Sequence, residues 1–274
     1  MVKETAGNAA LWRKVLLEGL PRERRMRQVM GRVPADPRCR MCNVPFHGVG
    51  GTLARLLVNR RQSPTNPVYC DSCDQFARKH PGGAEVEITM LFADVRGSTT
   101  LAEGMSPTEF SRLMNRFYAA AAHVMVHTGA WIDKLVGDEI IGLYIPSFSG
   151  PDHAGQALKC AQELLRATGH ADRSGPWLPV GVGVHTGSPF IGVVGSAEVT
   201  AITAIGDPMN TTARLASAAG VGEILVSEAA SKAAQADTTG LEARELQVRG
   251  RTDPVHVHVM TVREPLKVHH PDRA

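Results

Sequence analysis

Two aspartates have the type and the surroundings that metal-assisted chemistry would use. Asp94 follows an apolar stretch and precedes VRGST, and Asp138 lies in KLVGDEIIGLY, where an acidic pair interrupts an otherwise apolar run. A Gly-Asp pair is ordinary turn chemistry, so Asp138 could be there only because the turn is solvated. If the fold brings Asp94 and Asp138 together, however, their like charges need a cation between them, and carboxylate oxygens suit Mg²⁺ or Mn²⁺.

Four cysteines form a second candidate site. The segments CRMC and YCDSC contain two C-x2-C pairs, separated by residues 43–69. In a cytoplasmic protein such pairs favour a structural Zn²⁺ site of four thiolates. Because this separation is longer than in the usual zinc ribbon, an iron–sulfur cluster and free or redox-active thiols remain alternatives. We expect His47 to lie on the surface and Cys160 to be a packed core thiol. The candidate ligands are Cys39, Cys42, Cys70 and Cys73.

Charge is distributed unevenly along the chain. Residues 1–80 carry 15 Lys+Arg and 6 Asp+Glu, whereas residues 81–274 carry 15 and 21. This asymmetry predicts two modules, with a boundary at KHPGGAE, residues 79–85. Aromatic residues make up 5% of the chain, which argues against a nucleic-acid partner bound by base stacking. No apolar run of about 18 residues and no leader-like segment occurs, so we expect no integral membrane association and a cytoplasmic location.

Hydrophobic periodicity indicates the elements that must position the aspartates. Residues 85–95 have the pattern of a buried strand, and residues 106–129 have that of a helix. Residues 130–145 indicate a hairpin, residues 152–169 a second helix and residues 180–187 a further strand. The order β-α-β-β-α-β is that of a ferredoxin-like antiparallel sheet with helices on one face, which is an α+β fold. In such a sheet the first strand lies beside the hairpin, so Asp94 would face Asp138.

Local signals mark where several elements begin and end. Ser106 and Glu109 form a capping box at the start of the first of these helices. The hairpin turns near Gly137 and Asp138. The N-terminal region indicates two short helices, or one kinked at Pro21. Further along, we expect a strand over residues 189–195, a helix over 210–220 and a hairpin over 243–262.

Four segments of the sequence together resemble the motifs of a known family. The segments LFADVRGST, DKLVGDEIIGLY, VGVHTG and AIGDPMNTTARLA resemble, in order and spacing, the motifs of class III nucleotide cyclases. The resemblance covers roughly residues 85–262. With it, we expect a basic helical segment (1–36), a four-cysteine module (37–80), a class III nucleotide cyclase catalytic domain (85–264) and a tail (265–274).

The resemblance implies a role for each matching position. Asp94 and Asp138 match the two aspartates that hold two Mg²⁺ or Mn²⁺ ions per active site, and the Val95 carbonyl matches a further ligand. The metals would lower the pKa of the ribose 3′-hydroxyl and neutralise the triphosphate. Arg214 matches the arginine that stabilises charge on the α-phosphate in the transition state. Asn210 lies four residues earlier, on the same helical face, and matches the asparagine that orients the ribose.

Other matching positions would bind the phosphates. Gly97, Ser98 and Thr99 open a short helix, so their backbone N–H groups could hold the β- and γ-phosphates. Arg251 stands where relatives place a lysine that grips the terminal phosphates, and arginine is a chemically adequate substitute.

Two positions would read the base. Lys134 matches the purine-reading lysine and Thr203 its partner. Adenine offers an acceptor at N1 and a donor at N6, which suit a lysine and a threonine hydroxyl. The pair resembles an adenylate cyclase subgroup, whereas guanylate cyclases usually carry Glu at the Lys134 position.

The implied function is conversion of ATP to 3′,5′-cyclic AMP and pyrophosphate in a homodimer with shared sites. One position departs from the family, because Gly181 stands where many relatives place Arg or Lys against the triphosphate. A catalytically silent nucleotide-binding regulator is therefore an alternative, and guanylate cyclase activity is the runner-up among enzyme functions. A zinc-dependent nucleic-acid-binding protein that uses the basic module is a further alternative. The upstream regulator cannot be read from the sequence.

Overall fold

In the computed structural model of the protein, residues 2–19, 25–27, 29–30, 37–195, 200–247 and 253–264 are described. The chain divides into two compact units. The first comprises Met1–Val86, Pro146–Phe148 and Phe190–Ile205, and the second comprises Glu87–Ile145, Ser149–Pro189 and Gly206–Ala274. The division is therefore not a single cut in the sequence.

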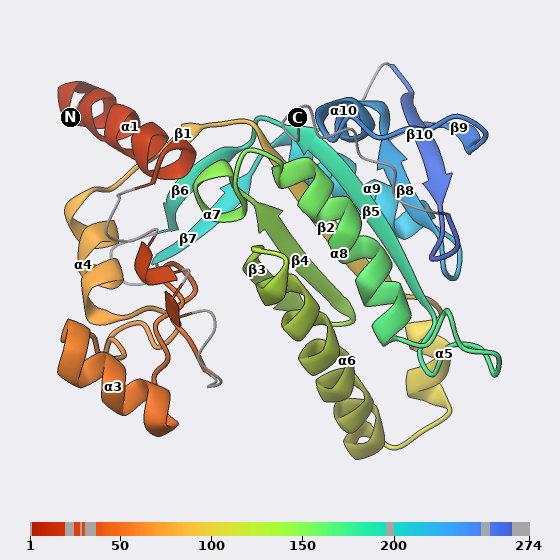
Figure 1. The fold of residues 1–274 in the computed structure, drawn as a ribbon, viewed down its shortest axis with the longest axis horizontal. Helices are drawn as coiled ribbons and strands as arrows, with labels where there is room; N and C mark the ends of the chain where they lie inside the picture. The colour runs from red at the N-terminus through yellow and green to blue at the C-terminus, as the bar shows by residue number, and fades with distance from the viewer. Residues whose placement is uncertain are drawn as a thin grey trace, which may run out of the picture. The chain divides into compact units, whose positions relative to one another are not determined.

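A seven-stranded sheet forms the second unit (Figure 1). All neighbouring strands are antiparallel except β5 and β8, which are parallel. The predicted α+β class is confirmed, and β2 lies beside the β3–β4 hairpin as expected. In spatial order the strands are β3 (Trp131–Val136), β4 (Glu139–Tyr144), β2 (Ile88–Val95), β5 (Val180–Gly187), β8 (Ile224–Ser227), β10 (Val255–Met260) and β9 (Glu242–Leu246).

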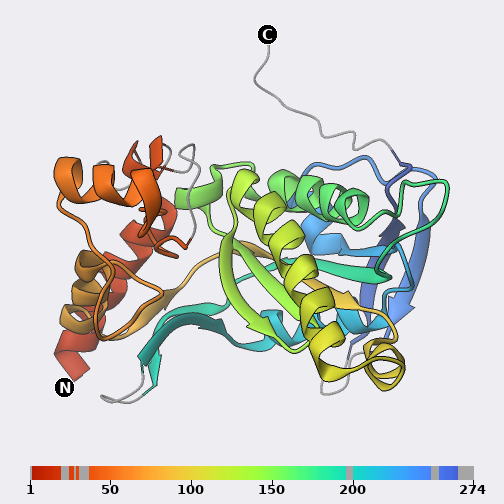
Figure 2. The same cartoon turned by 90° about the horizontal axis from the view of Figure 1, so that it is seen from below.

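Helices α6 (Pro107–His127) and α8 (His153–Ala167) lie side by side over one face of this sheet, as Figures 1 and 2 show. The predicted capping box is present at the start of α6. The Ser106 hydroxyl accepts from the Glu109 N–H at 3.3 Å, and the Glu109 carboxylate accepts from the Ser106 N–H at 2.9 Å. Two backbone donors at the helix start are therefore satisfied, which explains why α6 begins here.

Helices cover both faces of the sheet, so the expectation of helices on one face alone is wrong. On β8, Ile224 and Val226 belong to the main core with α6 and α8, whereas Leu225 between them packs with Leu215 of α9 (Asp207–Ala218). Successive side chains of a strand point to opposite faces, so α9 covers the face opposite α6 and α8. Helices cover both faces because β8 carries apolar side chains on both of its faces. The short helices α5 (Ser98–Glu103) and α10 (Glu228–Ala233) complete this unit.

The first unit contains a three-stranded antiparallel sheet in the order β1–β6–β7. The predicted strand over residues 189–195 is present as β6, while β7 was not foreseen. Residues 25–27 and 29–30 are helical, and the predicted kink at Pro21 falls outside the described residues. The elements of the first unit are α1 (Val2–Leu17), α3 (Gly48–Val58), α4 (Asp71–Lys79), β1 (Gly83–Glu85), β6 (Phe190–Gly195) and β7 (Thr200–Ile205), together with the first three residues of α7 (Pro146–Ser149).

Helix α1 is held by its one tryptophan. The Trp12 side chain is fully buried, donates to the His80 carbonyl at 2.9 Å and packs edge-on against Phe76 with ring centroids 5.3 Å apart. Among the described helices, none combines the length and the apolar character needed to cross a membrane.

Candidate active site

The carboxylate site forms where β2 ends beside the β3–β4 hairpin. In the β2–β4 ladder, Asp94 lies directly opposite Glu139, the residue after Asp138. The Val95 N–H donates to the Asp138 carbonyl at 3.2 Å and so fixes the turn against the end of β2. Gly137 has φ of 62°, a left-handed conformation that suits glycine, and forms the two-residue turn with Asp138. The strand register thus brings Asp94 and Asp138 to one place.

Burial and neighbouring carboxylates disfavour the ionised forms of Asp94 and Glu139. Burial is the main cause that raises the pKa of Asp94; the Asp138 charge adds to it, and Arg96 opposes it. Burial likewise raises the pKa of Glu139 to about 7, with Asp94 and Asp138 contributing. Such a cluster fits a divalent cation, whose charge would offset the repulsion. Glu139 was missed by the sequence analysis, although the acidic pair in GDEI was its visible signal.

Arg96 is a second residue that sequence reasoning missed. It forms an ion pair with Asp94 and donates to the carbonyls of Ser217 (2.8 Å) and Ala219 (3.4 Å) at the end of α9. The last carbonyls of a helix lack partners within the helix and carry partial negative charge, so a guanidinium is well placed there. One side chain therefore joins the carboxylate site to α9, the helix that carries Asn210 and Arg214.

Glycines in β5 allow α9 to approach the sheet. A Cβ at Gly183 would lie 2.4 Å from the Ala216 nitrogen, and a Cβ at Gly181 would lie 2.9 Å from the Ala219 carbonyl oxygen. Both positions must remain without side chains unless the backbone of α9 or the turn after it moves. The absence of a basic residue at position 181 thus has a local structural reason. Gly181 also pairs directly with Asp94 across the β2–β5 ladder.

Three further predicted residues of the second unit lie at its surface. Lys134, Asn210 and Arg214 are exposed, and the Lys134 ammonium lies 3.8 Å from the carboxylate of the buried Asp133. Asn210 and Arg214 are separated by one helical turn of α9, as expected.

Other predicted positions lie at the start of α5, in the first unit or outside the described residues. Gly97, with φ of 68°, is the N-cap of α5, and Ser98 and Thr99 form its first turn. Thr203 is buried in β7 of the first unit, opposite Gly192 of β6. Arg251 falls outside the described residues.

The four predicted cysteines come together in the first unit. Their sulfur atoms all lie within 4.8 Å of one another, and all four side chains are buried. A tetrahedral site with zinc–sulfur distances of about 2.3 Å needs sulfurs roughly 3.8 Å apart. The sulfurs of Cys42 and Cys70 are 3.6 Å apart, which fits such a site. The residues that cluster are those of the two C-x2-C pairs: Cys39, Cys42, Cys70 and Cys73.

Two short turns build the cysteine cluster. Asn43 adopts a left-handed φ of 58° after Cys42, and the Cys39 N–H donates to the Val44 carbonyl at 2.9 Å, which closes the first turn. Cys70 is the N-cap of α4, whose first turn contains Cys73. Each C-x2-C pair therefore sits in a tight local structure that presents two sulfurs to one side.

Donors surround the sulfurs. The Cys70 N–H donates to the Cys39 sulfur at 3.2 Å, and Arg60 donates to the Cys70 sulfur at 3.6 Å. Burial lowers the pKa of Arg27 to about 10, and the negative charges of Cys42, Cys39 and Cys73 oppose this shift. Positive charge and N–H groups at these positions suit a tetrathiolate site, because outer-shell donors stabilise metal-bound thiolates.

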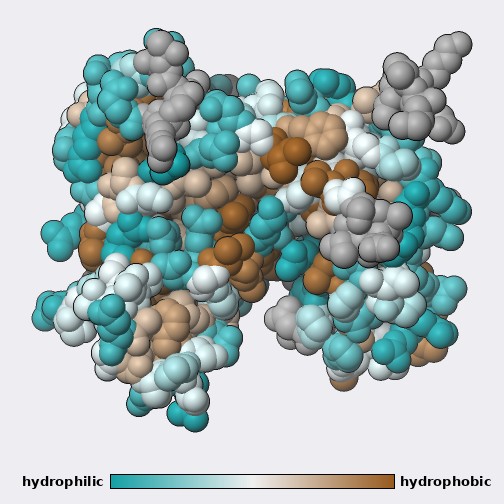
Figure 3. All heavy atoms as spheres, turned by 180° about the vertical axis from the view of Figure 1, so that it is seen from behind, coloured by the Kyte–Doolittle hydropathy of each residue, from teal (hydrophilic) through white to brown (hydrophobic). Residues whose placement is uncertain are grey.

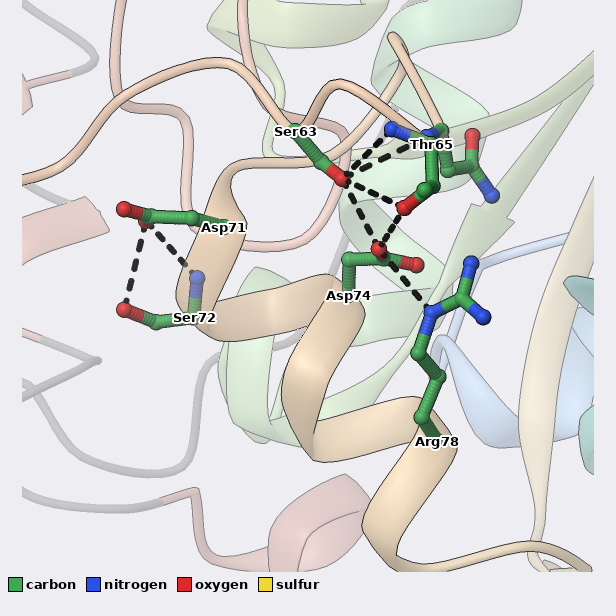
Figure 4. A network of polar contacts seen from close by, with 7 residues as sticks. Ser63, Thr65, Asp71, Ser72, Asp74 and Arg78 are labelled. Carbon is green, nitrogen blue, oxygen red and sulfur yellow. Dashed lines mark hydrogen bonds and ion pairs between the residues drawn. The ribbon is translucent and has the colours of Figure 1, made fainter.

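A polar network anchors the loop before the second cysteine pair to α4 (Figure 4). The Asp74 carboxylate accepts from Ser63 (2.8 Å), Thr65 (2.7 Å) and Arg78 (3.2 Å). Burial opposes ionisation of Asp74, but the hydrogen bonds from Thr65, Ser63 and Arg78 outweigh it and lower its pKa. The network thus favours the ionised form of Asp74, the residue that follows Cys73 in the sequence.

The match to known proteins extends over most of the second unit and over strands of the first unit. Residues 83–261 match the family described as adenylate and guanylate cyclase catalytic domain. An adenylate cyclase from Anabaena cylindrica is 32% identical over 134 residues, which cover 47% of this chain and 26% of that protein. Adenylate cyclase 1 from Rhizobium meliloti is 31% identical over 134 residues, 47% of this chain and 20% of that protein. The aligned region thus spans about a quarter or less of these relatives.

Solved structures give the same picture of the fold. The guanylyl cyclase Cya2 superposes with a TM-score of 0.61 and 31% identity, covering 68% of this chain and 98% of that one. The adenylyl cyclase CyaB from P. aeruginosa gives a TM-score of 0.56 and 24% identity, covering 69% of this chain and 98% of that one. Similar structures therefore include cyclases named for either nucleotide.

Proposed function

The chain belongs to the family of class III adenylate and guanylate cyclase catalytic domains, and from that premise we propose that it converts ATP to 3′,5′-cyclic AMP and pyrophosphate. The observation that carries the proposal is the pairing of Asp94 with the turn that holds Asp138, described above. A nucleotide cyclase needs a cation-binding site at this position, and the raised pKa values of Asp94 and Glu139 are those of carboxylates gathered for one.

Asp94, Asp138 and the Val95 carbonyl would hold two Mg²⁺ or Mn²⁺ ions. When bound, these ions would lower the pKa of the ribose 3′-hydroxyl and offset the charge of the triphosphate. Because Arg96 forms an ion pair with Asp94, a cation bound there would compete with this guanidinium, which would then be free to contact the substrate phosphates. The protein's own contribution is to hold the carboxylates in one register and to keep a guanidinium beside them.

Arg214 and Asn210 would act on the substrate directly. Both are exposed, at one-turn spacing on α9, so a neighbouring molecule can reach them. Arg214 would stabilise the charge that develops on the α-phosphate, and Asn210 would orient the ribose. The N–H groups of Gly97, Ser98 and Thr99, together with Arg251, would bind the β- and γ-phosphates.

We place the active sites in a homodimer, in which one subunit supplies the aspartates and the other supplies Arg214, Asn210 and the base-reading pair. Exposed apolar side chains support an interface on the hairpin, since Leu135 is 44% and Val136 54% exposed beside Lys134. Apolar groups also lie among polar ones on the face shown in Figure 3. Because one chain holds both sets of residues, a two-fold dimer would contain two equivalent sites.

Lys134 and Thr203 favour ATP over GTP. The relatives named adenylate cyclase agree with this choice, whereas one of the similar structures is a guanylyl cyclase. Guanylate cyclase activity is therefore the second candidate. A catalytically silent regulator is less well supported, because the steric reason for Gly181 accounts for the missing basic residue and Arg96 supplies a guanidinium beside the same strand pair.

The four-cysteine module would bind Zn²⁺ and serve as a regulatory segment of the cyclase, with an upstream regulator still to be found. Its sulfur geometry and its N–H donors support a tetrathiolate metal site. Visible absorbance with bound iron would instead assign an iron–sulfur cluster.

The deciding experiment incubates purified protein with ATP or GTP and with Mg²⁺ or Mn²⁺, followed by chromatographic separation of the cyclic products. We expect cyclic AMP from ATP, and loss of activity on the order of a hundredfold or more in Asp94→Ala and Asp138→Ala. Glu103→Ala, which removes an exposed carboxylate at the end of α5, is the matched control and should keep wild-type turnover. Cyclic GMP as the main product would replace the ATP assignment, and no cyclic product from either nucleotide would overturn the proposed function.

A further inference from the structure

A cavity beside the cysteine cluster shares no residue with the carboxylate site. Its volume is about 160 Å³ and its surface is mainly apolar. An engineered protein cavity of about 150 Å³ accommodates a benzene molecule, so this one can hold a single ring. Its lining residues within the described part of the chain all belong to the first unit, and they include Val15, Arg27, Met41, Phe76, Ser147 and Phe148.

Ser147 is the polar residue that indicates a ligand. Its side chain is 4% exposed and lines the cavity, and its hydroxyl has no hydrogen-bond partner among the described residues. Buried hydroxyls are almost always hydrogen-bonded, so an unsatisfied one in a residue that lines a cavity needs an explanation. An oxygen atom of a bound molecule would satisfy it.

The charges at the cavity wall are already directed to other groups. Arg27 donates to the Met41 carbonyl at 2.9 Å, and its guanidinium stacks 4.3 Å from the Phe148 ring centre. Arg60, which also lines the cavity, donates to the Cys70 sulfur. These two cations offset the negative charge of the thiolates, so an anionic ligand would add a buried charge without a counter-charge. The site therefore favours an uncharged molecule.

We propose that this cavity binds a compact, uncharged aromatic molecule whose hydroxyl or carbonyl oxygen hydrogen-bonds to Ser147. The rings of Phe76 and Phe148 line the cavity and give it aromatic surroundings that suit an aromatic molecule. The apolar side chains of Val15 and Met41 complete a surface on which such a ring loses little hydration.

The position of the cavity in the chain gives the site a regulatory meaning, and this part rests on the proposed cyclase function. Ser147 and Phe148 belong to α7, which begins at Pro146, and β4 ends at Tyr144. The same strand begins at Glu139, directly after Asp138. A ligand that contacts α7 is therefore linked, through one intervening residue, to the strand that begins beside Asp138, and we expect it to change turnover.

Binding is tested with para-fluorophenol and fluorobenzene as probes, followed by fluorine NMR on the full-length protein without nucleotide. We expect saturable binding of both, with the phenol bound about fivefold more tightly because it adds one hydrogen bond. Ser147→Ala should remove this difference, while Ser174→Ala, at an exposed serine, should keep it. Absence of saturable phenol binding, or an unchanged preference in Ser147→Ala, would overturn the site.

Two further measurements separate the site from effects on folding and catalysis. Without ligand, Ser147→Ala should melt at the same temperature as wild type or higher, because it removes an unsatisfied buried hydroxyl; a clear decrease would show that Ser147 already has a partner. Val15→Phe, which places a ring in the cavity, should abolish binding. Para-fluorophenol should change turnover of wild type but not of Val15→Phe. Binding without any change in turnover would overturn the regulatory part, and an inactive cyclase would leave the binding result standing.

Discussion

Arg96 connects Asp94 to the end of α9, because its guanidinium forms an ion pair with the Asp94 carboxylate and donates to the Ser217 carbonyl at 2.8 Å. The two partners lie on different elements of the second unit, one at the end of a central strand and the other in the last turn of a helix. Any group that binds Asp94 must compete with this guanidinium. The ion pair therefore links occupancy of the carboxylate site to the position of the helix that carries Arg214.

Removal of the Arg96 charge should strengthen cation binding. In Arg96→Gln the amide can still donate to a helix carbonyl, while the site loses its competing positive charge. We expect Mn²⁺ to bind about fivefold more tightly in calorimetric titrations without nucleotide, since an ion pair of this kind contributes on the order of 1 kcal/mol. Arg112→Gln, at an exposed position of α6, removes the same charge elsewhere and should leave the affinity unchanged. Equal affinities in the two variants would show that Arg96 does not compete.

Inactive variants should complement each other if active sites are shared. Asp94→Ala destroys the carboxylate side of a site, and Arg214→Ala destroys the other side. Random pairing of equal amounts makes half of the dimers mixed, each with one intact site, so about a quarter of wild-type activity should return. The assay is cyclic nucleotide formation after mixing or co-expression. Mixing Asp94→Ala with Asp138→Ala is the matched control and should stay inactive; recovery there, or none in the first mixture, contradicts the shared site.

The close approach of α9 to β5 should make Gly183 intolerant of a side chain. The added Cβ of Gly183→Ala would lie 2.4 Å from the Ala216 nitrogen and 2.8 Å from the Leu215 Cβ. We expect a loss of about 2 kcal/mol in the free energy of unfolding, measured in urea, as α9 is pushed from the sheet. Gly104→Ala is the control, because its nearest neighbour would be 3.5 Å away and its backbone is right-handed. A Gly183→Ala protein as stable as Gly104→Ala would disprove this packing account.

Much of the second unit follows from local sequence signals. Ser106 and Glu109 indicate the start of α6 because capping is a contact between near neighbours, and the Gly137 turn fixes the register of the β3–β4 hairpin. The alternating glycines of VGVGV are visible in the sequence too, where they indicate a strand and, at Gly181, a missing basic residue, but no contact with a helix. The close approach of α9 to these glycines depends on residues 212–219. No periodic pattern in the sequence predicts that those residues contact β5.

Other features depend on contacts between distant parts of the chain. The partners Arg96 and Ser217 are 121 positions apart, and no spacing rule links them. The three-residue strand β1 pairs with β6, more than a hundred positions later in the sequence. The β6–β7 hairpin, which contains Thr203, therefore belongs to the first unit. The cysteine cluster can be predicted because each C-x2-C pair is recognised from its spacing in the sequence. That two such pairs share one metal ion is expected from the chemistry of thiolate ligands. Glu139 is not identified from the sequence, because a second acidic residue at a turn is commonly there only because the turn is exposed to solvent.

Glu223 should contribute to stability above its ordinary pKa. Its carboxylate accepts two hydrogen bonds from Arg244 (2.9 and 2.8 Å), which are the main cause that lowers its pKa below the ordinary value of 4.5; the Gly220 N–H adds to this. A carboxyl whose pKa is lowered in the folded state stabilises it at higher pH, and this contribution is lost as the pH falls through the folded-state pKa. We expect Glu223→Gln to cost about 1 kcal/mol near pH 7, with a smaller difference at pH 4 and below.

Urea unfolding of both proteins across this pH range measures the effect. Glu103→Gln serves as the control, since its carboxylate is exposed. A stability difference for Glu223→Gln that stays constant from neutral to acidic pH would show that the ionised pair is not its source.

The cysteine cluster should bind one metal ion that supports the fold of the first unit. Cys39→Ser with Cys42→Ser removes two of four sulfurs within 4.8 Å of one another and leaves Asp94 and Asp138 unchanged. Because a tetrathiolate site supplies folding free energy of its own, we expect elemental analysis to find close to one zinc per chain in wild type and much less in the variant. Cys160→Ser alters a buried thiol outside the cluster and should keep the metal.

Turnover per dimer should change in the double variant if the module regulates the cyclase. Loss of metal with unaltered kinetics would restrict the module to a structural role, and wild-type protein without any metal would contradict the site itself.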